Sequence, residues 1–165
     1  MEAESDVTRW HNYYADGHAH FCTLTVKEWR PLLMAENVQV LYDVWQEARQ
    51  VLGVRILAYV VMADHFHAML WGEQGQSVAR FLQRVSSLVS KKLQPGGGFW
   101  KERPRVLPVY SPRVFRTKVE YIHNNPITRG LAACADDWPH SSFRQIVMGR
   151  SDVPFQCDAW DSIGM

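Results

Sequence analysis

The sequence has few cysteines and no long apolar run, and each of these absences excludes a class of protein. Its three cysteines, Cys22, Cys134 and Cys157, are odd in number, widely spaced and outside any CxxC pattern. They form neither a disulfide framework nor a zinc knuckle, so we expect reduced thiols. No apolar stretch reaches the ~20 residues of a transmembrane helix, and the acidic start MEAESDV is unlike a secretory signal. We therefore expect a cytoplasmic protein with no membrane partner.

An overall excess of positive charge is also missing, because 18 Lys and Arg residues face 17 Asp and Glu residues. The charge is nevertheless uneven, since the segment 77–118 carries ten cations and one acid, Glu102, between two acidic segments. A local basic surface suits a polyanion lying across one side of the molecule, although an ordinary solvated face has the same composition. The candidate DNA-binding cations are Arg80, Arg84, Lys91, Lys92, Lys101, Arg103, Arg105, Arg113, Arg116 and Lys118.

The length of the chain, 165 residues, suits one well-buried domain and is short for two. We therefore expect a single domain over residues 1–165. Its last part, 151–165, is an acidic tail, and we expect the large aromatic residues Phe155 and Trp160 to dock this tail on the body. The aromatic residues Trp10, Tyr13 and Tyr14 are interpreted as a small lid.

The segment YVVMADHFHAMLW, residues 59–71, holds two histidines one residue apart in apolar surroundings. Side chains alternate between faces in extended backbone, so His65 and His67 point one way and Phe66 points the other. Residues 55–62 are expected to form a second apolar strand, which an Ala-Asp turn joins to the strand that carries the two histidines. Both strands are apolar on both faces, which is typical of central strands in a helix-covered sheet. Two imidazoles can hold a metal, but a third ligand must come from elsewhere.

A first strand is expected at 20–26, with Phe21 and Thr23 on one face. His18 and His20 are also two residues apart, at the mouth of this strand. Their neighbours are polar, so we interpret both histidines as surface residues and not as ligands.

Helices are expected where apolar residues recur with helical spacing. One runs from Asn37, its capping residue, to about residue 52, and another runs from Ser77 to about residue 93. An edge strand containing Pro108 follows at 106–110. Ser111 and a following proline begin a third helix, which we expect to stop before Pro126.

The third helix carries a second candidate for chemistry. Lys118, Tyr121 and Asn125 are three and four residues apart and therefore neighbours on one helix face. A divalent metal held by two imidazoles and an amide oxygen would keep open positions and polarise a phosphate for attack by the phenol. From the residues alone, an ordinary helix-surface tyrosine remains the simpler interpretation of Tyr121.

Two stretches resemble a known family. MADHFHAML is similar to the histidine-hydrophobic-histidine (HUH) motif of single-tyrosine HUH transposases. YIHNNPITRGLAACADDWPHSSFR closely resembles the signature that begins at the catalytic tyrosine in their REP-associated tyrosine transposase branch, which is IS200-like. The similarity covers about residues 18–148, with both motifs in the family's order. It implies a ferredoxin-like α+β fold with an antiparallel sheet and packed helices.

The resemblance also implies roles for individual residues. His65 and His67 correspond to the metal ligands, Asn125 to a third ligand, and Tyr121 to the nucleophile, with Mg²⁺ or Mn²⁺ as cofactor. The implied reaction is cleavage of single-stranded DNA beside an imperfect hairpin, through a 5′-phosphotyrosine link and a free 3′-hydroxyl. The implied setting is the nucleoid of a bacterial cytoplasm, as a monomer or homodimer.

Different functions stay open at this point, because family members are usually basic overall and this chain has acidic ends. One is an active endonuclease and strand transferase, a transposase. Another is a domesticated, non-catalytic protein that binds hairpin DNA. A hydrolase of small phosphoesters is a third possibility, but such an enzyme needs a general base, and the candidate residues do not supply one.

Overall fold

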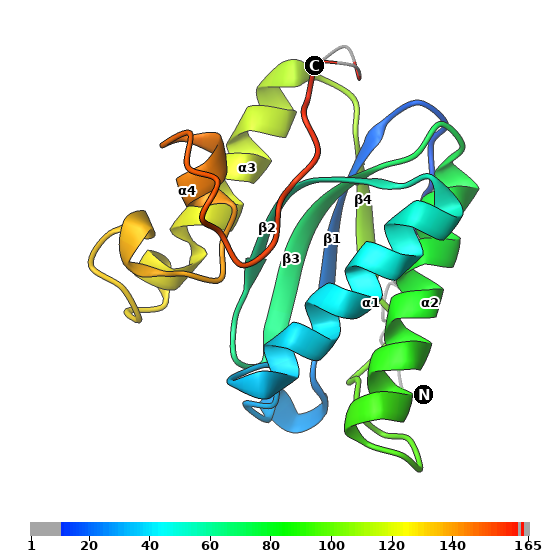
Figure 1. The fold of residues 1–165 in the computed structure, drawn as a ribbon. Coiled ribbons are helices and arrows are strands. Elements are labelled where there is room, and N and C mark those ends of the chain that lie inside the picture. Colours follow the sequence, from blue (N-terminus) through cyan, green and yellow to red (C-terminus); the bar gives the residue numbers. More distant parts are fainter. Residues whose placement is uncertain (1–10, 162, 164–165) are drawn as a thin grey trace, which may run out of the picture.

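Four antiparallel strands form the middle layer of the structure, a computed structural model that describes residues 11–161 and 163 (Figure 1). Helices cover both faces of the sheet, whose strand order is β2-β3-β1-β4. The strands are β1 (Ala19–Thr25), β2 (Arg55–Val61), β3 (His65–Trp71) and β4 (Arg105–Val109). The helices are α1 (Glu36–Leu52), α2 (Gly75–Leu93), α3 (Pro112–Thr128) and α4 (Phe143–Ile146), with 3-10 turns η1 (Lys27–Trp29) and η2 (Ala135–Asp137). The predicted ferredoxin-like α+β fold is confirmed.

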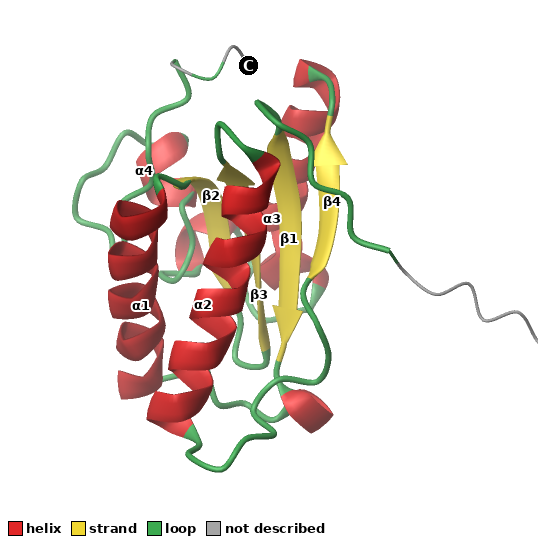
Figure 2. Cartoon of the chain, turned by 90° about the vertical axis from the view of Figure 1, so that its right-hand side faces the viewer, coloured by secondary structure: helices red, strands yellow, loops and turns green. Residues whose placement is uncertain are grey.

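Alternation along β3 assigns its side chains to two separate cores. Phe66 and Leu70 join the core beneath α1 and α2, where Trp45 is fully buried. Met69 joins the second core with Phe115 of α3. Figure 2 shows α1 and α2 in front of the sheet. His65 and His67 share the face of Met69, as the alternation predicted, and the structure shows that this face is turned toward α3.

One strand prediction is wrong, because β2 lies at the edge of the sheet and not at its centre. Its outer edge is nevertheless covered by chain from far along the sequence. Val61 N donates to His140 O at 2.8 Å, and Asp158 N donates to Ile56 O at 2.8 Å. Because these later segments cover the outer edge of β2, this strand can be as apolar as a central strand.

The aromatic residues of the C-terminal segment dock on the body as predicted. Phe155 is buried, and its carbonyl oxygen accepts a hydrogen bond from the Tyr59 hydroxyl at 3.0 Å. The Trp160 indole donates to Leu57 O at 2.8 Å and meets the Phe115 ring edge-on at 4.9 Å. Of the residues predicted to form a lid, Tyr14 packs on the core and Tyr13 is exposed, whereas Trp10 lies outside the described residues.

The first two helices begin earlier than their predicted capping residues. The α1 helix starts at Glu36, and Asn37 does not cap it; its amide instead donates to Leu32 O at 2.9 Å. The α2 helix starts at Gly75, two residues before Ser77. A Cβ at Gly75 would lie 2.7 Å from the Tyr14 carbonyl carbon, so this start requires glycine.

The third helix begins as predicted and ends later. Ser111 Oγ caps it by accepting from Val114 N at 3.2 Å, but the helix passes through Pro126 to Thr128. Beyond the proline, Arg129 N donates to Asn125 O at 3.1 Å, so the backbone is satisfied and the helix continues. This extra turn brings Arg129 toward the histidines of β3, where its charge lowers the pKa of both rings.

Several smaller predictions have clear outcomes. All three cysteines are free thiols. The predicted edge strand with Pro108 is β4. Among the helices formed by residues 11–161 and 163, none is long and apolar enough to cross a membrane.

Candidate active site

The two histidines of β3 are buried side by side, with ring centres 4.9 Å apart. Each is held through its Nδ1 atom. His65 Nδ1 lies 2.6 Å from Asp64 Oδ1, and His67 Nδ1 lies 2.7 Å from Thr23 Oγ1 on β1. A carboxylate accepts hydrogen bonds, so Nδ1 of His65 carries the proton and Nε2 presents its lone pair. Carboxylate support of this kind is common behind metal-binding histidines.

Both imidazoles are neutral at physiological pH. Burial lowers the pKa of His67 to about 3, and the nearby positive charges of Arg129 and Lys118 lower it further. Burial also lowers the pKa of His65, while Asp64 opposes the shift. A metal ligand must be unprotonated, so burial prepares this pair for coordination.

Asn125 on α3 supplies the strongest local indication of a bound cation. It is 3% exposed, and none of the described residues gives its Oδ1 a hydrogen-bond partner; the same holds for Nε2 of the buried His65. Asn125 is also close enough to His65 to raise its pKa against the effect of burial. Leaving two buried acceptors unpaired costs about 1–3 kcal/mol each. A cation between them would remove that cost, so the donor set fits a divalent metal.

The amide is essential to this donor set. In the part of the chain that the structure describes, no three His, Cys, Asp or Glu side chains come together to hold a metal. His65, His67 and Asn125 together offer two nitrogens and one oxygen, which suits a mid-sized divalent ion with open positions for substrate. The structure therefore brings together the three predicted ligands.

Tyr121 stands at the mouth of the same site, 48% exposed. Its ring meets the His67 ring at 5.4 Å between centres and the Phe21 ring at 5.8 Å. Lys118 Nζ lies 4.9 Å from the Phe21 ring centre and 5.8 Å from that of Tyr121. The accessible phenol therefore lies close to both a cation and the buried imidazole pair. The helix spacing predicts that Lys118 and Tyr121 are neighbours, and the structure confirms this.

The ten predicted DNA-binding cations do not share one face. Arg80, Arg84, Lys91 and Lys92 lie on α2, on the opposite side of the sheet from the histidines, whereas Arg113, Arg116 and Lys118 lie on α3. Lys101, Arg103 and Arg105 lie in the segment between these helices. Two of the ten already have acidic partners, since Arg84 pairs with Glu47 and Arg105 pairs with Glu102. The expected single basic face is therefore divided by the sheet.

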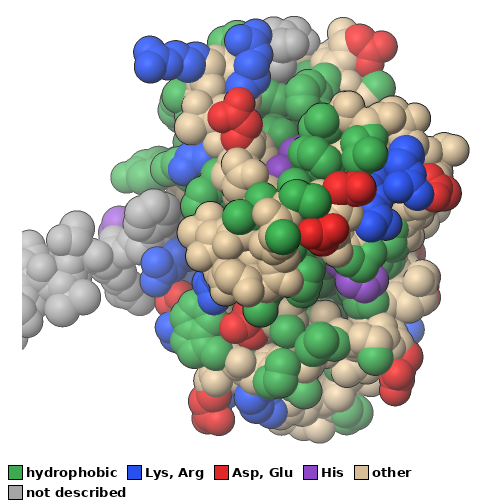
Figure 3. Space-filling view, turned by 90° about the vertical axis from the view of Figure 1, so that its left-hand side faces the viewer, with side chains coloured by type: hydrophobic (Ala, Val, Ile, Leu, Met, Phe, Trp, Pro, Cys, Tyr) green, Lys and Arg blue, Asp and Glu red, His purple; other side chains and the backbone are tan. Residues whose placement is uncertain are grey.

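The surface on the α3 side does not carry one continuous basic patch. Figure 3 shows Lys and Arg side chains in separate groups among hydrophobic and polar ones, with histidine atoms visible between them. A hollow of about 190 Å³ lies beside the site on this side, lined by residues that include Phe21, Thr23, Arg105 and Lys118.

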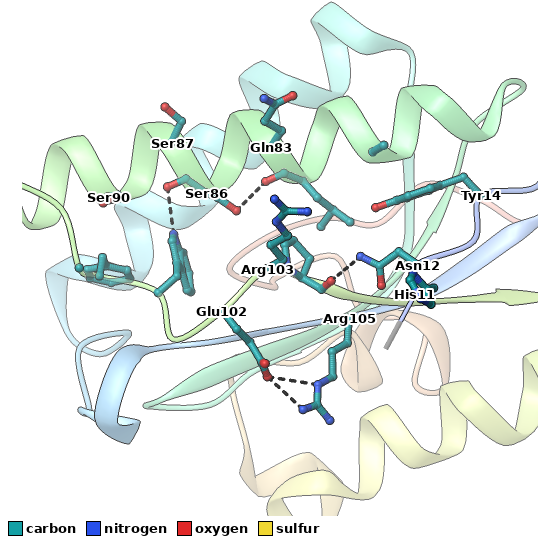
Figure 4. Close-up of a pocket in the computed structure, with 16 residues that line it drawn as sticks. His11, Asn12, Tyr14, Gln83, Ser86, Ser87, Ser90, Glu102, Arg103 and Arg105 are labelled. Carbon is teal, nitrogen blue, oxygen red and sulfur yellow. Dashed lines mark hydrogen bonds and ion pairs between the residues drawn. The ribbon is translucent and has the colours of Figure 1, made fainter. Parts of the chain in front are cut away.

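A larger hollow, of about 1230 Å³, lies on the α2 side of the sheet (Figure 4). Arg103 and Asn12 lie across this groove from Gln83 of α2. Arg105 lines both hollows, so the β4 edge is where they approach each other. The groove contains none of the predicted metal ligands, and we do not assign the chemistry to it.

Two further buried histidines show what an ordinary core histidine looks like here. His123 Nε2 lies 2.9 Å from Ser142 Oγ, and burial lowers its pKa to about 4. His20 Nε2 accepts from Ala15 N at 3.0 Å, so its Nδ1, which has no partner among the described residues, is a donor and not a possible ligand; burial lowers the pKa of His20 to about 4 as well. The interpretation of His20 as a surface residue is wrong, because the chain before β1 folds back over it; His18 is partly exposed.

Sequence reasoning misses the residues that support the site. Asp64 has the pattern of a turn residue, and Arg129 lies beyond the predicted end of the helix. Thr23 is placed on the correct strand face, but its partner His67 lies 44 positions later and follows only from the β1–β3 register.

Comparisons with known proteins show what the chain is similar to. Residues 14–125 match the model of a family described as transposase IS200 like. A REP-associated tyrosine transposase of Escherichia coli (strain K12) is 23% identical over 158 residues, covering 94% of each chain. A solved structure of the REP-associated tyrosine transposase bound to a REP hairpin has a TM-score of 0.78 at 22% identity, covering 96% of this chain and 98% of the other. This structural likeness supports the common fold.

Proposed function

The chain belongs to the IS200-like transposase family, and from that premise we propose that it is a metal-dependent endonuclease and strand transferase for single-stranded DNA. The observation that carries this proposal is the pair of unpartnered buried acceptors, His65 Nε2 and Asn125 Oδ1, beside the accessible phenol of Tyr121. A folded protein tolerates such atoms where function requires them.

The proposed reaction is a transfer of one phosphodiester bond. Bound Mg²⁺ or Mn²⁺, held by His65, His67 and Asn125, would supply Lewis acidity at a phosphate oxygen. Tyr121 Oη attacks the phosphorus and loses its proton to solvent, and the bond from phosphorus to the 3′ oxygen breaks. That oxygen takes up a proton and leaves as a 3′-hydroxyl, while the 5′-phosphate stays on Tyr121. One bond forms as one breaks, so the link retains the energy for rejoining.

The supporting residues have positioning roles in this proposal. Asp64 and Thr23 fix the two imidazole rings, and Lys118 places a positive charge beside the phenol, where a phosphate would lie. Phe21 packs against both His67 and Tyr121 and excludes water from one side of the site. Preorganised groups of this kind stabilise charge without rearranging during the reaction.

Hairpin DNA is the proposed partner. The support is a fold-level likeness to a transposase whose structure contains a REP hairpin, together with exposed cations on α3 and in the segment 101–105. Contacts of cations with phosphates position the nucleic acid and make binding depend on salt.

The test is to look for the covalent intermediate. The protein is incubated with single-stranded hairpin oligonucleotides and Mg²⁺ or Mn²⁺, and the adducted peptide is sequenced. We expect a DNA 5′-phosphate on Tyr121, and we expect Tyr121→Phe to abolish the adduct while DNA binding and fold persist. Tyr110→Phe is the matched control, because Tyr110 is also an exposed tyrosine.

Two outcomes separate the proposal from its alternatives. An adduct on Tyr110 or Tyr13 would overturn the assignment of Tyr121. Hairpin binding without an adduct on any hairpin from the host genome would instead identify a non-catalytic hairpin-binding protein. The near-neutral charge of the chain and the two cations already paired with acids are the features that favour this second function.

A further inference from the structure

We propose that Trp29 is a stacking platform for an unpaired DNA base beside the site of cleavage, with Lys101 and Arg129 contacting the phosphates next to that base. This inference rests on the proposed function, since it places single-stranded DNA at the histidine pair. It adds to the active site a substrate contact that lies outside the motifs.

The position of Trp29 follows from the way its turn is held. The η1 turn follows β1 directly, and Val26 N at its start donates to Asp64 O at 2.8 Å. Asp64 is the residue that orients His65, so the turn is anchored to the support of the site. The Trp29 ring meets the His65 ring edge-on at 6.3 Å between centres. A base on this indole would therefore lie within about one nucleotide of the proposed metal ligands.

The backbone holds this indole out to solvent in an unfavourable conformation. Glu28 has φ 59° and Trp29 has φ 56°, in the left-handed region that residues with a side chain rarely adopt. Hydrogen bonds maintain the turn, with Lys27 N donating to Phe99 O at 2.8 Å and Trp29 N to Val26 O at 3.0 Å. Trp29 nevertheless remains 47% exposed. Strain that exposes a large apolar ring is typical of a binding site.

Two cations from separate parts of the chain meet at this ring. Lys101 Nζ lies 4.9 Å from the ring centre and Arg129 Cζ lies 5.8 Å from it. An aromatic ring flanked by cations is the usual composition of a site for single-stranded nucleic acid, where bases stack and phosphates pair with the charges. A cation–π contact at an exposed position is weaker than stacking of a base on an aromatic ring, so the base displaces the cations. The displaced cations then reach the phosphates on either side.

The same features distinguish Trp29 from other exposed aromatic side chains. Tyr110 is 66% exposed, more than Trp29, but its ring contacts the His18 ring at 5.0 Å. It also lies at the end of β4, away from the η1 end of the sheet. A protein partner would cover the indole but leave the charges of Lys101 and Arg129 without anions. Single-stranded DNA satisfies both the ring and the charges.

The experiment uses photo-crosslinking in the Tyr121→Phe background, where no covalent adduct can form. Hairpin oligonucleotides carry 5-iodouracil at successive positions of their unpaired flanks, and crosslinked peptides are mapped after irradiation. We expect one flank position to crosslink to the peptide that contains Trp29. We expect Trp29→Ala to weaken binding of the flanked hairpin roughly 5- to 100-fold, Trp29→Phe to retain most of the affinity, and Tyr110→Ala to change it by less than about twofold.

Further controls make each outcome decisive. A hairpin without flanks should bind Trp29→Ala and the parent equally, and circular dichroism reports whether the variants fold. Unchanged affinity of Trp29→Ala, or crosslinks that map elsewhere at every position, overturns the platform even where the wild type forms its tyrosine adduct. A crosslink at Trp29 in the Tyr121→Phe protein, together with a wild-type protein that forms no tyrosine adduct, overturns the catalytic proposal and leaves the platform standing.

Discussion

The two faces of β3 differ in how their side chains find partners. On the α1 and α2 side, Phe66 packs edge-on against Trp45 at 5.1 Å, and Leu70 is fully buried. On the α3 side, the buried histidine pair is held through Nδ1, while Nε2 of His65 has no partner. Among the described residues, the unpartnered buried atom on the first face is a donor, Trp45 Nε1, whereas on the second face it is an acceptor, His65 Nε2, which is the type of atom that can bind a cation. We infer that the first face provides stability and the second provides chemistry.

Burial alone does not produce this difference. His123 is as deeply buried as His67 and lies on the same side of the sheet, yet its Nε2 has a partner in Ser142. A buried histidine with a satisfied ring stabilises the packing of α3 on β2. The unsatisfied acceptor is therefore the feature that distinguishes the candidate site.

The largest expected effect tests the α3 side directly. His65→Ala should slow formation of the tyrosine adduct by on the order of 10³-fold, because it removes a ligand of the ion that would stabilise charge on the transferring phosphate. Unfolding by urea should shift little, since the removed ring left an acceptor unpaired. The rate of adduct formation and a urea melt are measured on the same preparation, with Met69→Leu as a same-face control. A large loss of stability in His65→Ala would blur the difference between the two faces.

The next effect tests the α1 and α2 side. Phe66→Ala should lower the free energy of unfolding by about 3–5 kcal/mol, because it leaves a cavity beneath Trp45 and Trp100. Adduct formation per folded molecule should change only a fewfold, since Phe66 points away from the site. Urea unfolding gives the first quantity and a single-turnover assay at low temperature gives the second. Abolished chemistry in a folded Phe66→Ala would show that the faces are coupled.

A smaller effect comes from acid. Burial lowers the pKa of His20 from its ordinary value of 6.5 to about 4. Between pH 6.5 and 4, His20 is therefore protonated in the unfolded state but neutral in the folded state. Stability contributed by the neutral ring is present at neutral pH and decreases as pH falls through that window. Lowering pH from 7 to 5 should lower stability by about 1–2 kcal/mol through this residue.

The matched variant for the acid prediction is His20→Gln, which keeps an acceptor for Ala15 N but does not titrate. Urea midpoints at pH 7 and pH 5 are compared for the two proteins. The difference between the midpoints should shrink in the variant. An identical pH dependence would mean that the pKa of His20 is the same in the folded and the unfolded protein.

The smallest effect concerns the divided cations. Reversing Arg113 and Arg116 to glutamate should weaken binding of single-stranded hairpin DNA several-fold at low salt. The slope of log affinity against log salt should fall by roughly 0.7 for each phosphate that the variant no longer neutralises. Reversing Arg80 and Lys91 on α2 should have less effect, because α2 lies on the opposite face of the sheet from the histidine pair. Fluorescence anisotropy across a salt series measures both, and a larger effect of the α2 pair would place the DNA on the opposite side.

Local patterns explain which parts of the fold were predictable. The shared face of His65 and His67 follows from alternation, and the start of α3 follows from the Ser-Pro pair at 111–112. These features depend on neighbours within four residues. The edge position of β2 depends on hydrogen bonds to His140 and Asp158, about eighty and one hundred residues away along the chain, which no local pattern contains.

The candidate site was predictable in its motif residues and not in its supports. The family resemblance suggested roles for Tyr121 and Asn125 that the residues alone did not require. Arg129 escapes sequence reasoning because proline usually ends a helix, and here the helix continues. Trp29 lies outside every motif, and its importance follows from a strained turn that cannot be read from the sequence.

The strand order also constrains how this chain reaches its final form. β1 lies between β3 and β4, which follow it by about forty-five and eighty-five residues, so the earliest strand completes its hydrogen bonds last. Until residue 109 has been synthesised, the outer edge of β1 is an open template for pairing with other chains. During synthesis on the ribosome, the risk of aggregation is therefore greatest in the interval between β3 and β4, and a pause in translation there would prolong that exposure.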